Sequence, residues 1–341
     1  MKTIWYHFVK YYVRLGFAFY FKEIRIYNAE NIPKNKAVLF VANHQNALLD
    51  PILIGSTNPR EMHYLTRAQV FKKPLIKALL HSINMLPIFR IRDGFETLSK
   101  NEAVFQNCYS LLEKQEAILM FPEGNHNLKR RVRVLSKGFT RIVFGALEKN
   151  PENEIVIVPI GLNYSEPTKY ASKVSLYYGK PISVKPYWEN YDKNDSVTNL
   201  KEDVREQLKI LTTHIEDLEN YDAICNHFDT DSFLFPEMVN KKLETHIHST
   251  PAIETTKKQS KILETFVKLN SIFPLLIWKT ISPKIEEEEF IGTFKFTVGI
   301  TAFPLFYLLQ TGIISSLFGE IYAIIYFIVS LLSVFILTKT R

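Results

Sequence analysis

Cysteine is scarce in this sequence, and its scarcity limits the chemistry available to the chain. The 341 residues contain two cysteines, Cys108 and Cys225, which are far apart and lack metal-ligand spacing. They indicate reduced, buried thiols and exclude a disulfide framework. The nearest approach to a ligand pair is His246-x-His248 in a polar stretch, which does not predict a metal site. The expected metal content is therefore none.

Several nucleotide and hydrolase signatures are also missing. The sequence has no Gly-x-Ser-x-Gly elbow, no Gly-x-x-x-x-Gly-Lys phosphate loop, no dinucleotide fingerprint and no internal repeat. What it has is a 46% apolar composition, which allows a sizeable core, and a net charge of +7. A basic excess suits nucleic acid, anionic lipid or phosphorylated small molecules. The aromatic fraction of 13% suits a membrane surface as well as a core.

A histidine and an aspartate follow the first apolar run that is typical of a buried strand, residues 36–42. His44 comes just after this run, and Asp50 is six residues further on. A histidine at a strand end with a carboxylate nearby is suited to be a general base with an orienting partner. Because Asp50 precedes Pro51, the alternative interpretation is a plain helix cap by Asp50 or by Asn43. The two roles are compatible.

A second polar turn occurs about 80 residues later, again after an apolar run. Phe121, Pro122, Glu123 and Gly124 directly follow the predicted strand 116–121 or form its end. Glycine lets backbone N–H groups approach a ligand closely, and Glu123 is a candidate to hold a ligand hydroxyl. These residues predict a binding turn.

Arginines near these turns are candidates for phosphate binding. Arg90 and Arg92 alternate along a predicted strand and so point to opposite faces, which lets one of them face a cleft. The alternative is two solvated charges. The basic cluster 129–133 is a common and nonspecific pattern for nucleic acid, and beside a membrane it instead predicts contact with phosphate headgroups.

Between residues 30 and 190, short apolar runs alternate with helical patterns, which predicts a layered α/β domain. The expected strands are 36–42, 61–65, 85–91, 116–121, 154–163 and 173–179. The expected helices are 51–57, 72–83, 97–114 and 136–149, with a charged helix at 196–218. Residues 240–265 are polar and predict a linker.

Both ends of the chain have compositions that predict membrane contact. Residues 1–28 mix aromatic and basic side chains, which favours an interfacial helix, or alternatively an amphipathic helix packed on the protein's own core. The segments 296–310 and 321–337 are almost wholly apolar, which predicts transmembrane helices at about 294–313 and 317–338. The alternative for this pair is one buried hairpin in a soluble core.

Charges around the hairpin predict its orientation. Basic residues flank it outside and none lies in its connecting loop, so both termini and the α/β domain are expected on the cytoplasmic face of an integral membrane protein. The predicted divisions are an interfacial helix at 1–28, a catalytic domain at 29–190, a helical extension and linker at 191–265, and a membrane anchor at 266–341.

Four blocks resemble, in order and spacing, those of the glycerolipid acyltransferases, a superfamily that includes glycerol-3-phosphate and lysophosphatidic acid acyltransferases. The blocks are Asn43-His44 through Asp50, Pro87 to Arg90, Phe121 to Gly124, and Val158 to Ile160. The resemblance covers roughly residues 30–185. It implies an α/β fold with a mixed central sheet flanked by helices, to which the C-terminal two-helix transmembrane hairpin is added.

The resemblance also implies roles for the matching residues. His44 would take the proton from the acceptor hydroxyl, and Asp50 would orient its imidazole. Arg90, Glu123 and Gly124 would bind the phosphorylated glycerol, and Asn46, Phe121 and Pro122 would lie beside them. Val158, Pro159 and Ile160 would line the acyl-donor side. The implied reaction has no covalent enzyme intermediate and no cofactor other than acyl-CoA or acyl carrier protein as co-substrate.

Two departures concern the identity of the acceptor. Five residues separate His44 from Asp50, where four are common, and this spacing resembles the glycerol-3-phosphate or dual-acceptor subgroup. The third block continues Asn125-His126-Asn127 in place of Thr-Arg-Ser.

The expected function is acylation of lysophosphatidic acid to phosphatidic acid in phospholipid synthesis, with the lipid bilayer as partner and no nucleic acid. Glycerol 3-phosphate is the alternative acceptor. A second enzymatic alternative is a remodelling transacylase. From another class, the alternative is a non-catalytic lipid-binding membrane adaptor, against which the intact His44, Asp50, Glu123 and Arg90 argue.

Overall fold

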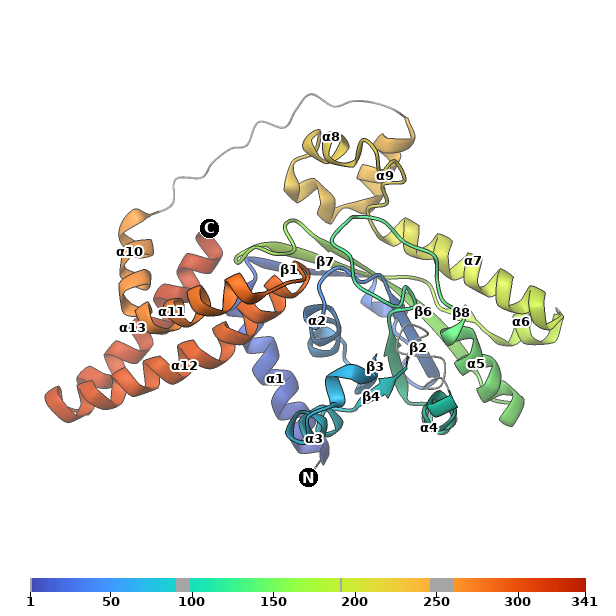
Figure 1. The fold of residues 1–341 in the computed structure, drawn as a ribbon, viewed down its shortest axis with the longest axis horizontal. Helices are drawn as coiled ribbons and strands as arrows, with labels where there is room; N and C mark the ends of the chain where they lie inside the picture. Colours follow the sequence, from blue (N-terminus) through green and yellow to red (C-terminus); the bar gives the residue numbers. More distant parts are fainter. Residues whose placement is uncertain (1, 90–98, 191, 246–259) are drawn as a thin grey trace.

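A single mixed β-sheet forms the centre of the protein in the computed structural model, which describes residues 2–89, 99–190, 192–245 and 260–341. Figure 1 shows the sheet with helices around it and a helical hairpin projecting to one side. The strands are β1 (Glu23–Tyr27), β2 (Ala37–Ala42), β3 (Met62–Arg67), β4 (Met85–Ile88), β5 (Ala117–Met120), β6 (Ile155–Tyr164), β7 (Lys173–Tyr178) and β8 (Ile182–Ser183).

The strand order is β1-β7-β6-β2-β5-β3-β4, with β8 pairing with β6. Strands β6, β2, β5, β3 and β4 are parallel to one another, whereas β7 is antiparallel to β6, and β1 is parallel to β7. The carboxyl ends of β2, β3, β5 and β6 therefore meet at the same edge of the sheet, where ligands bind in open α/β folds. The predicted α/β class with a mixed central sheet is confirmed.

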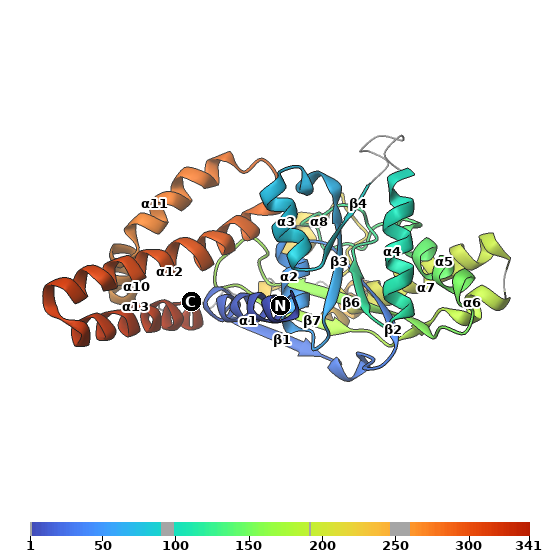
Figure 2. The same cartoon turned by 90° about the horizontal axis from the view of Figure 1, so that it is seen from below.

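The helices of the domain are α1 (Lys2–Tyr20), α2 (Leu49–Thr57), α3 (Pro74–Ser82), α4 (Asn101–Glu113), α5 (Gly138–Lys149), α6 (Lys185–Asn190), α7 (Lys193–Leu211), α8 (Tyr221–Asn226) and α9 (Pro236–Glu244). The C-terminal helices are α10 (Lys261–Asn270), α11 (Ile272–Ile281), α12 (Phe290–Phe318) and α13 (Glu320–Thr340). The view from below in Figure 2 shows α1 lying alongside the hairpin on one side of the sheet and α4 and α5 on the other.

Strand β2 separates two hydrophobic cores because successive side chains point to opposite faces of a sheet. Val38, Phe40 and Ala42 pack with residues of α1, α2 and α3 on one face. Ala37, Leu39 and Val41 pack with residues of α4, α5 and α7 on the other. All six residues of β2 are fully buried, which agrees with the apolar run from which the strand was predicted.

The N-terminal segment differs from the single helix that its composition predicted. Helix α1 ends at Tyr20, and residues 23–27 form the edge strand β1. One face of α1 is buried through Phe17 and Tyr20, while Ile4 and Phe8 are exposed. The alternative interpretation therefore holds, because the helix packs on the protein's own core, and its contact with a membrane interface stays a prediction.

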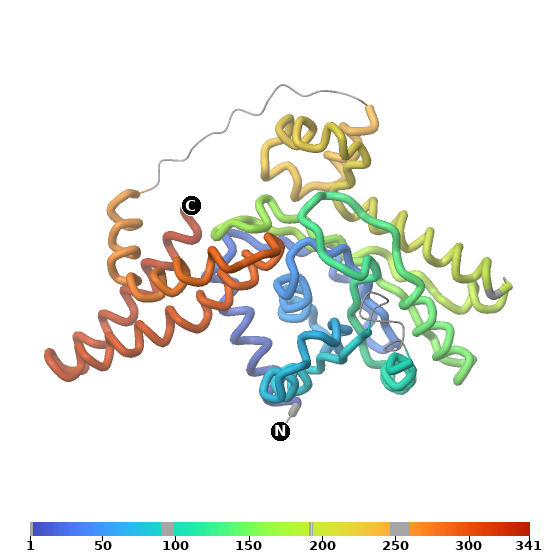
Figure 3. The backbone as a smooth tube through the Cα atoms, viewed as in Figure 1, coloured from blue at the N-terminus to red at the C-terminus, as the bar shows by residue number. Residues whose placement is uncertain are grey.

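The C-terminal hairpin projects from the domain, as the tube view in Figure 3 shows. Helices α12 and α13 are long and apolar enough to cross a membrane, and most of their surface is exposed, so they are candidate membrane spans. The predicted span 294–313 lies within α12, whereas the predicted span 317–338 includes the last two residues of α12, Gly319 and most of α13. The base of the hairpin packs against α1, where the rings of Phe17 and Phe296 stack with centroids 4.3 Å apart. Two lysines bond the ends of the hairpin to the domain. Lys295 donates to the carbonyl of Thr168, and Lys339 donates to the carbonyl of Phe21.

Candidate active site

His44 and Asp50 form a hydrogen-bonded pair at the carboxyl end of β2. The distance between His44 Nδ1 and Asp50 Oδ2 is 2.8 Å. Asp50 is fully buried, and three further donors meet its carboxylate: the backbone N–H groups of Gln45 and Asn46, both at 2.8 Å, and the Tyr164 hydroxyl at 2.6 Å. A carboxylate with this many donors is held in one orientation, and it fixes the imidazole in turn.

The helix-cap interpretation of these residues is wrong. Helix α2 begins at Leu49, so Asp50 lies inside the first turn, and its carboxylate accepts from the loop that precedes the helix. The side chain of Asn43 instead ties β2 to β6, because it accepts from the Leu162 N–H at 2.7 Å and donates to the Leu162 carbonyl at 3.0 Å. Asn43 therefore fixes the end of β2 to the neighbouring strand β6 and does not cap α2.

The second ring nitrogen of His44, Nε2, is available to accept a proton. Nε2 has no hydrogen-bond partner among the described residues, and the side chain is 15% exposed. With Nδ1–H donated to Asp50, Nε2 carries the lone pair that can accept a proton. The ring of Phe121 stacks on the imidazole with centroids 4.0 Å apart, and His126 meets it edge-on at 5.5 Å. The blocks that contain His44 and Phe121 therefore meet in space.

Glu123 lies in the same turn, but its carboxylate is already paired. Its side chain is 2% exposed and accepts from Arg133 Nε at 2.7 Å. Burial raises the pKa of Glu123 above its ordinary value, and the Arg133 guanidinium and His44 oppose this effect only in part. Gly124 has a φ of +76°, a left-handed conformation that favours glycine, and a Cβ there would meet nothing within 4 Å.

Two arginines of the basic cluster 129–133 are used inside the protein. Arg130 is buried, and its guanidinium donates to the carbonyls of Tyr164 and Ser165 at 2.7 and 2.8 Å. Burial lowers the pKa of Arg130 to about 10. Arg133 is bound to Glu123 and Asn125. For Arg130 the predicted headgroup contact is wrong, because its buried guanidinium is bonded at the end of β6, whereas Arg133 is paired within the turn that follows β5.

The other predicted substrate residues lie in different environments. Asn46 is buried beside the pair, and its amide donates to the Pro167 carbonyl at 2.6 Å. Pro122 is buried, and the carbonyl of Pro122 accepts from Ser136. Val158, Pro159 and Ile160 lie within β6, directly beside β2, and are all buried. Arg90 and Arg92 lie outside the described residues, as do His246 and His248, so the roles predicted for the two arginines stay predictions.

Sequence reasoning missed three residues at this edge of the sheet. Tyr164 ends β6 and bonds Asp50, and burial together with the carboxylate raises its pKa well above the ordinary value. His126 lies beside His44, and burial lowers its pKa. Arg67 ends β3, close enough for its charge to contribute to this lowering. Only His126 left a signal in the sequence, as the departure from Thr-Arg-Ser.

A candidate metal-ligand set lies next to His126. Its ring nitrogens and the carboxylates of Glu287 and Glu289 all lie within 4.8 Å of one another. The Glu287 side chain is 54% exposed, and a histidine between two acidic side chains is equally an ordinary ion-pair contact. The geometry supports no assignment of a metal here.

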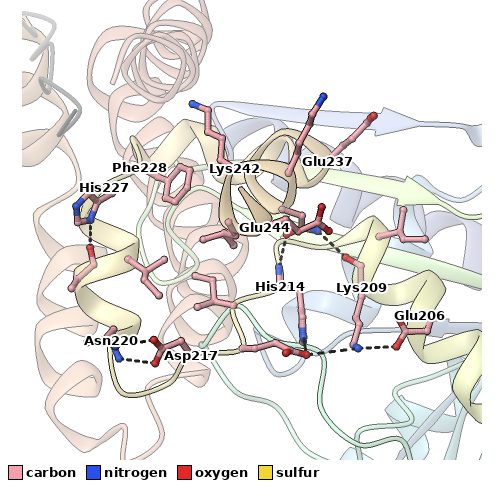
Figure 4. A pocket seen from close by; sticks show the side chains of 18 residues that line it. Glu206, Lys209, His214, Asp217, Asn220, His227, Phe228, Glu237, Lys242 and Glu244 are labelled. Carbon is pink, nitrogen blue, oxygen red and sulfur yellow. Dashed lines mark hydrogen bonds and ion pairs between the residues drawn. The ribbon is translucent and has the colours of Figure 1, made fainter. Parts of the chain in front are cut away.

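A large cavity of about 1070 Å³ lies elsewhere, between α7, α8 and α9, and is shown in Figure 4. Polar side chains that line it bond to one another, as Lys209 does to Glu206 and Asn220 to Asp217. No residue of the His44 site lines it, so size alone does not identify the active site in this protein.

Comparison with known proteins agrees with the resemblance carried by the four blocks. A family model described as Acyltransferase matches residues 23–163. The chain is 27% identical over 121 residues to glycerol-3-phosphate O-acyltransferase 1 of Saccharomyces cerevisiae, which covers 34% of this chain and 16% of that protein. It is 24% identical over 102 residues to 1-acyl-sn-glycerol-3-phosphate acyltransferase of Bacillus subtilis. This alignment covers 30% of this chain and 47% of that protein.

Two further matches have lower identity over a larger part of the chain. Glycerol-3-phosphate O-acyltransferase 2 of Saccharomyces cerevisiae is 19% identical over 314 residues, which covers 61% of this chain and 42% of that protein. A crystal structure of the 1-acyl-sn-glycerophosphate acyltransferase of Thermotoga maritima matches with a TM-score of 0.43 and 16% identity, over 63% of this chain and 83% of that one. The chain spans less than half the length of each of these curated relatives.

Proposed function

We propose that this chain, whose residues 23–163 belong to the glycerolipid acyltransferase superfamily, transfers a fatty acyl group from a thioester to the hydroxyl of a phosphorylated glycerol. The observation that carries the proposal is the His44–Asp50 pair at the carboxyl end of β2, with Nδ1 bonded to the buried carboxylate and Nε2 left to accept a proton.

The proposed reaction is a direct attack on the thioester. Nε2 of His44 takes the hydroxyl proton while the oxygen bonds to the thioester carbonyl carbon. Asp50 stabilises the imidazolium that forms. The C–S bond then breaks, and the leaving thiolate receives the proton from the imidazolium. A positioned base typically contributes about 10²–10⁴-fold, and orientation of the two substrates adds more.

The acceptor is recognised through its phosphate. Arg90 is the predicted ligand, and Arg67, at the end of β3, is a further candidate cation. Glu123 and Gly124 are proposed to contact the glycerol, with Arg133 holding Glu123 in place.

Lysophosphatidic acid and glycerol 3-phosphate share this chemistry. We propose lysophosphatidic acid as the acceptor, with glycerol 3-phosphate as the alternative. The five-residue spacing between His44 and Asp50, and the names of the yeast relatives, favour the second.

Location at a bilayer follows from the acyl chain. Each methylene transferred to water costs roughly 0.8 kcal/mol, so a long chain is best handled at a membrane. Helices α12 and α13 supply the anchor, and the contacts of Lys295 and Lys339 keep both ends of the hairpin on the side of the domain. We therefore propose an integral membrane protein with both termini and the catalytic domain on the cytoplasmic face.

The test is an assay of the full chain in detergent micelles or membranes with labelled acyl-CoA or acyl carrier protein. Glycerol 3-phosphate, lysophosphatidic acid and a lysophospholipid are compared as acceptors, and labelled phospholipid is offered as donor to detect transacylation. We expect turnover with one or both phosphorylated glycerols. Binding to anionic vesicles without turnover of any acceptor would establish the membrane adaptor instead.

His44→Ala is expected to remove turnover while the protein stays folded and bound to membranes. His63→Ala is a matched control, because His63 also pairs with a carboxylate, that of Glu116 at 2.6 Å, and is 14% exposed. That pair lies at the amino ends of β3 and β5, at the opposite edge of the sheet. Equal losses in the two variants would contradict the assignment of His44 as the base.

A further inference from the structure

The amino end of α2, which carries Asp50, takes its cap from a distant helix. The residue before the helix, Leu48, makes no side-chain cap. The N–H of Leu49 instead donates to the hydroxyl of Thr293 at 3.2 Å, and Thr293 is 244 residues away in the first turn of α12. Free N–H groups at a helix start require an acceptor, and here the acceptor is supplied by the first helix of the hairpin.

Gly292 brings the same turn of α12 onto the catalytic loop. A Cβ at this position would lie 2.6 Å from Asn46 Oδ1 and 3.0 Å from the Pro167 carbonyl oxygen, so only glycine allows this approach. Asn46 is bonded on both sides of this contact, since its amide donates to Pro167 and its backbone N–H donates to Asp50. The helix therefore packs on a residue that itself holds the catalytic carboxylate.

The opposite side of this turn is fixed to the domain as well. The Tyr20 hydroxyl donates to the Gly292 carbonyl at 3.3 Å, and the Phe290 ring meets that of His126 with centroids 5.1 Å apart. Thr293 is buried, at 7% exposure. The start of α12 is therefore enclosed by the domain, whereas the remainder of this helix is mostly exposed.

We propose that Gly292 and Thr293 are positioning residues of the acyl-transfer site. They hold residues 45–50 in the conformation that aims Asp50 at His44. This inference rests on the proposed function and adds a role for the C-terminal hairpin beyond anchoring. Because α12 is also the first candidate membrane span, attachment to the bilayer and alignment of the catalytic pair depend on one helix.

Removal of the Thr293 hydroxyl tests the capping contact. The variants are assayed in detergent micelles, where tethering to a membrane no longer matters. Thr293→Val keeps the shape of the side chain and removes the acceptor, and Thr293→Ser keeps the acceptor. We expect Thr293→Val to lower kcat about 5- to 10-fold with both KM values changed less than twofold, and Thr293→Ser to recover most of the rate. The acidic limb of the kcat–pH profile should move to lower pH in Thr293→Val, because a misaligned Asp50 stabilises the imidazolium less.

Two glycines of α12 provide a matched pair for the packing contact. Gly292→Ala should lower kcat by a similar or larger factor, because the added methyl displaces Asn46. Gly299→Ala gains the same helix propensity, and its Cβ would meet nothing within 4 Å, so its kcat should stay within twofold of the parent. Equal kcat values in Gly292→Ala and Gly299→Ala would overturn the proposal. So would a kcat loss in Thr293→Val that Thr293→Ser shares and that leaves the pH profile unshifted.

Hydrogen exchange separates this inference from the proposed function. A peptide spanning residues 45–52 should exchange faster in Thr293→Val and Gly292→Ala than in the parent or in Gly299→Ala, whether or not the protein transfers acyl groups. If no acceptor is turned over but exchange rises as expected, the proposed function fails while the contact stands. If turnover is present and neither exchange nor kcat changes, the inference alone fails.

Discussion

Two histidine–carboxylate pairs lie at opposite edges of the sheet and are alike in distance and in exposure of the ring. His44 and Asp50 are 2.8 Å apart, and His63 and Glu116 are 2.6 Å apart. They differ in the carboxylate, because Asp50 is fully buried with three further donors, whereas the Glu116 side chain is 41% exposed. A general base requires a fixed partner at the ligand-binding edge of the sheet, and only the first pair meets both requirements.

The largest expected effect comes from the two carboxylates. Asp50→Asn should lower kcat on the order of 10²-fold, because the amide no longer stabilises the imidazolium and presents a donor where the site requires an acceptor. Glu116→Gln should change kcat less than twofold, since an exposed ion pair contributes about 0–1 kcal/mol. Steady-state kinetics of both variants measures the difference. A comparable loss from Glu116→Gln would remove the distinction between the pairs.

A smaller effect is expected from the hydroxyl that meets Asp50. Tyr164→Phe removes one of four donors and should lower kcat about tenfold, because a hydrogen bond to a charged group is worth roughly 1.5–3 kcal/mol and the other donors compensate in part. Tyr178→Phe is the control, since Tyr178 is equally buried on the neighbouring strand and its hydroxyl meets Asn58. The kcat values of the two variants decide whether Tyr164 acts through Asp50.

A third carboxyl, that of the buried Glu123, gives a further test. If Glu123 contacts the acceptor, Glu123→Gln should raise the acceptor KM several-fold and leave the KM for the thioester within twofold. Unchanged values for both substrates would show that Glu123 serves only to hold Arg133.

The smallest expected effect is the pH dependence that Glu123 gives to stability. Burial raises the pKa of Glu123 in the folded state above its unfolded value, so folding favours the protonated form. Its contribution to the free energy of unfolding is therefore full below the unfolded pKa, near 4.3, and is lost as pH rises through the raised value. The Tm of the parent minus that of Glu123→Gln should fall between pH 4 and pH 7. A constant difference would contradict the effect of burial.

Much of the domain was predictable because its signals are local. The buried strand β2 follows from one apolar run, and the turn at Glu123 follows from another. Strand β1 also left a signal, because Glu23, Ile24, Arg25 and Ile26 alternate polar and apolar residues, but the aromatic composition around it favoured a longer helix.

The sequence by itself determined which residue types follow the strands: His44 after β2 and Glu123 after β5, with two apolar helices at the end of the chain. Only the tertiary structure decided that Tyr164 donates a hydrogen bond to the Asp50 carboxylate, that Arg133 pairs with Glu123, and that Thr293 caps α2. The physical reason is that hydrogen-bond partners 10, 114 or 244 residues apart in irregular segments leave no periodic pattern in a sequence. They meet because parallel strands bring their carboxyl ends to one edge, where α12 packs.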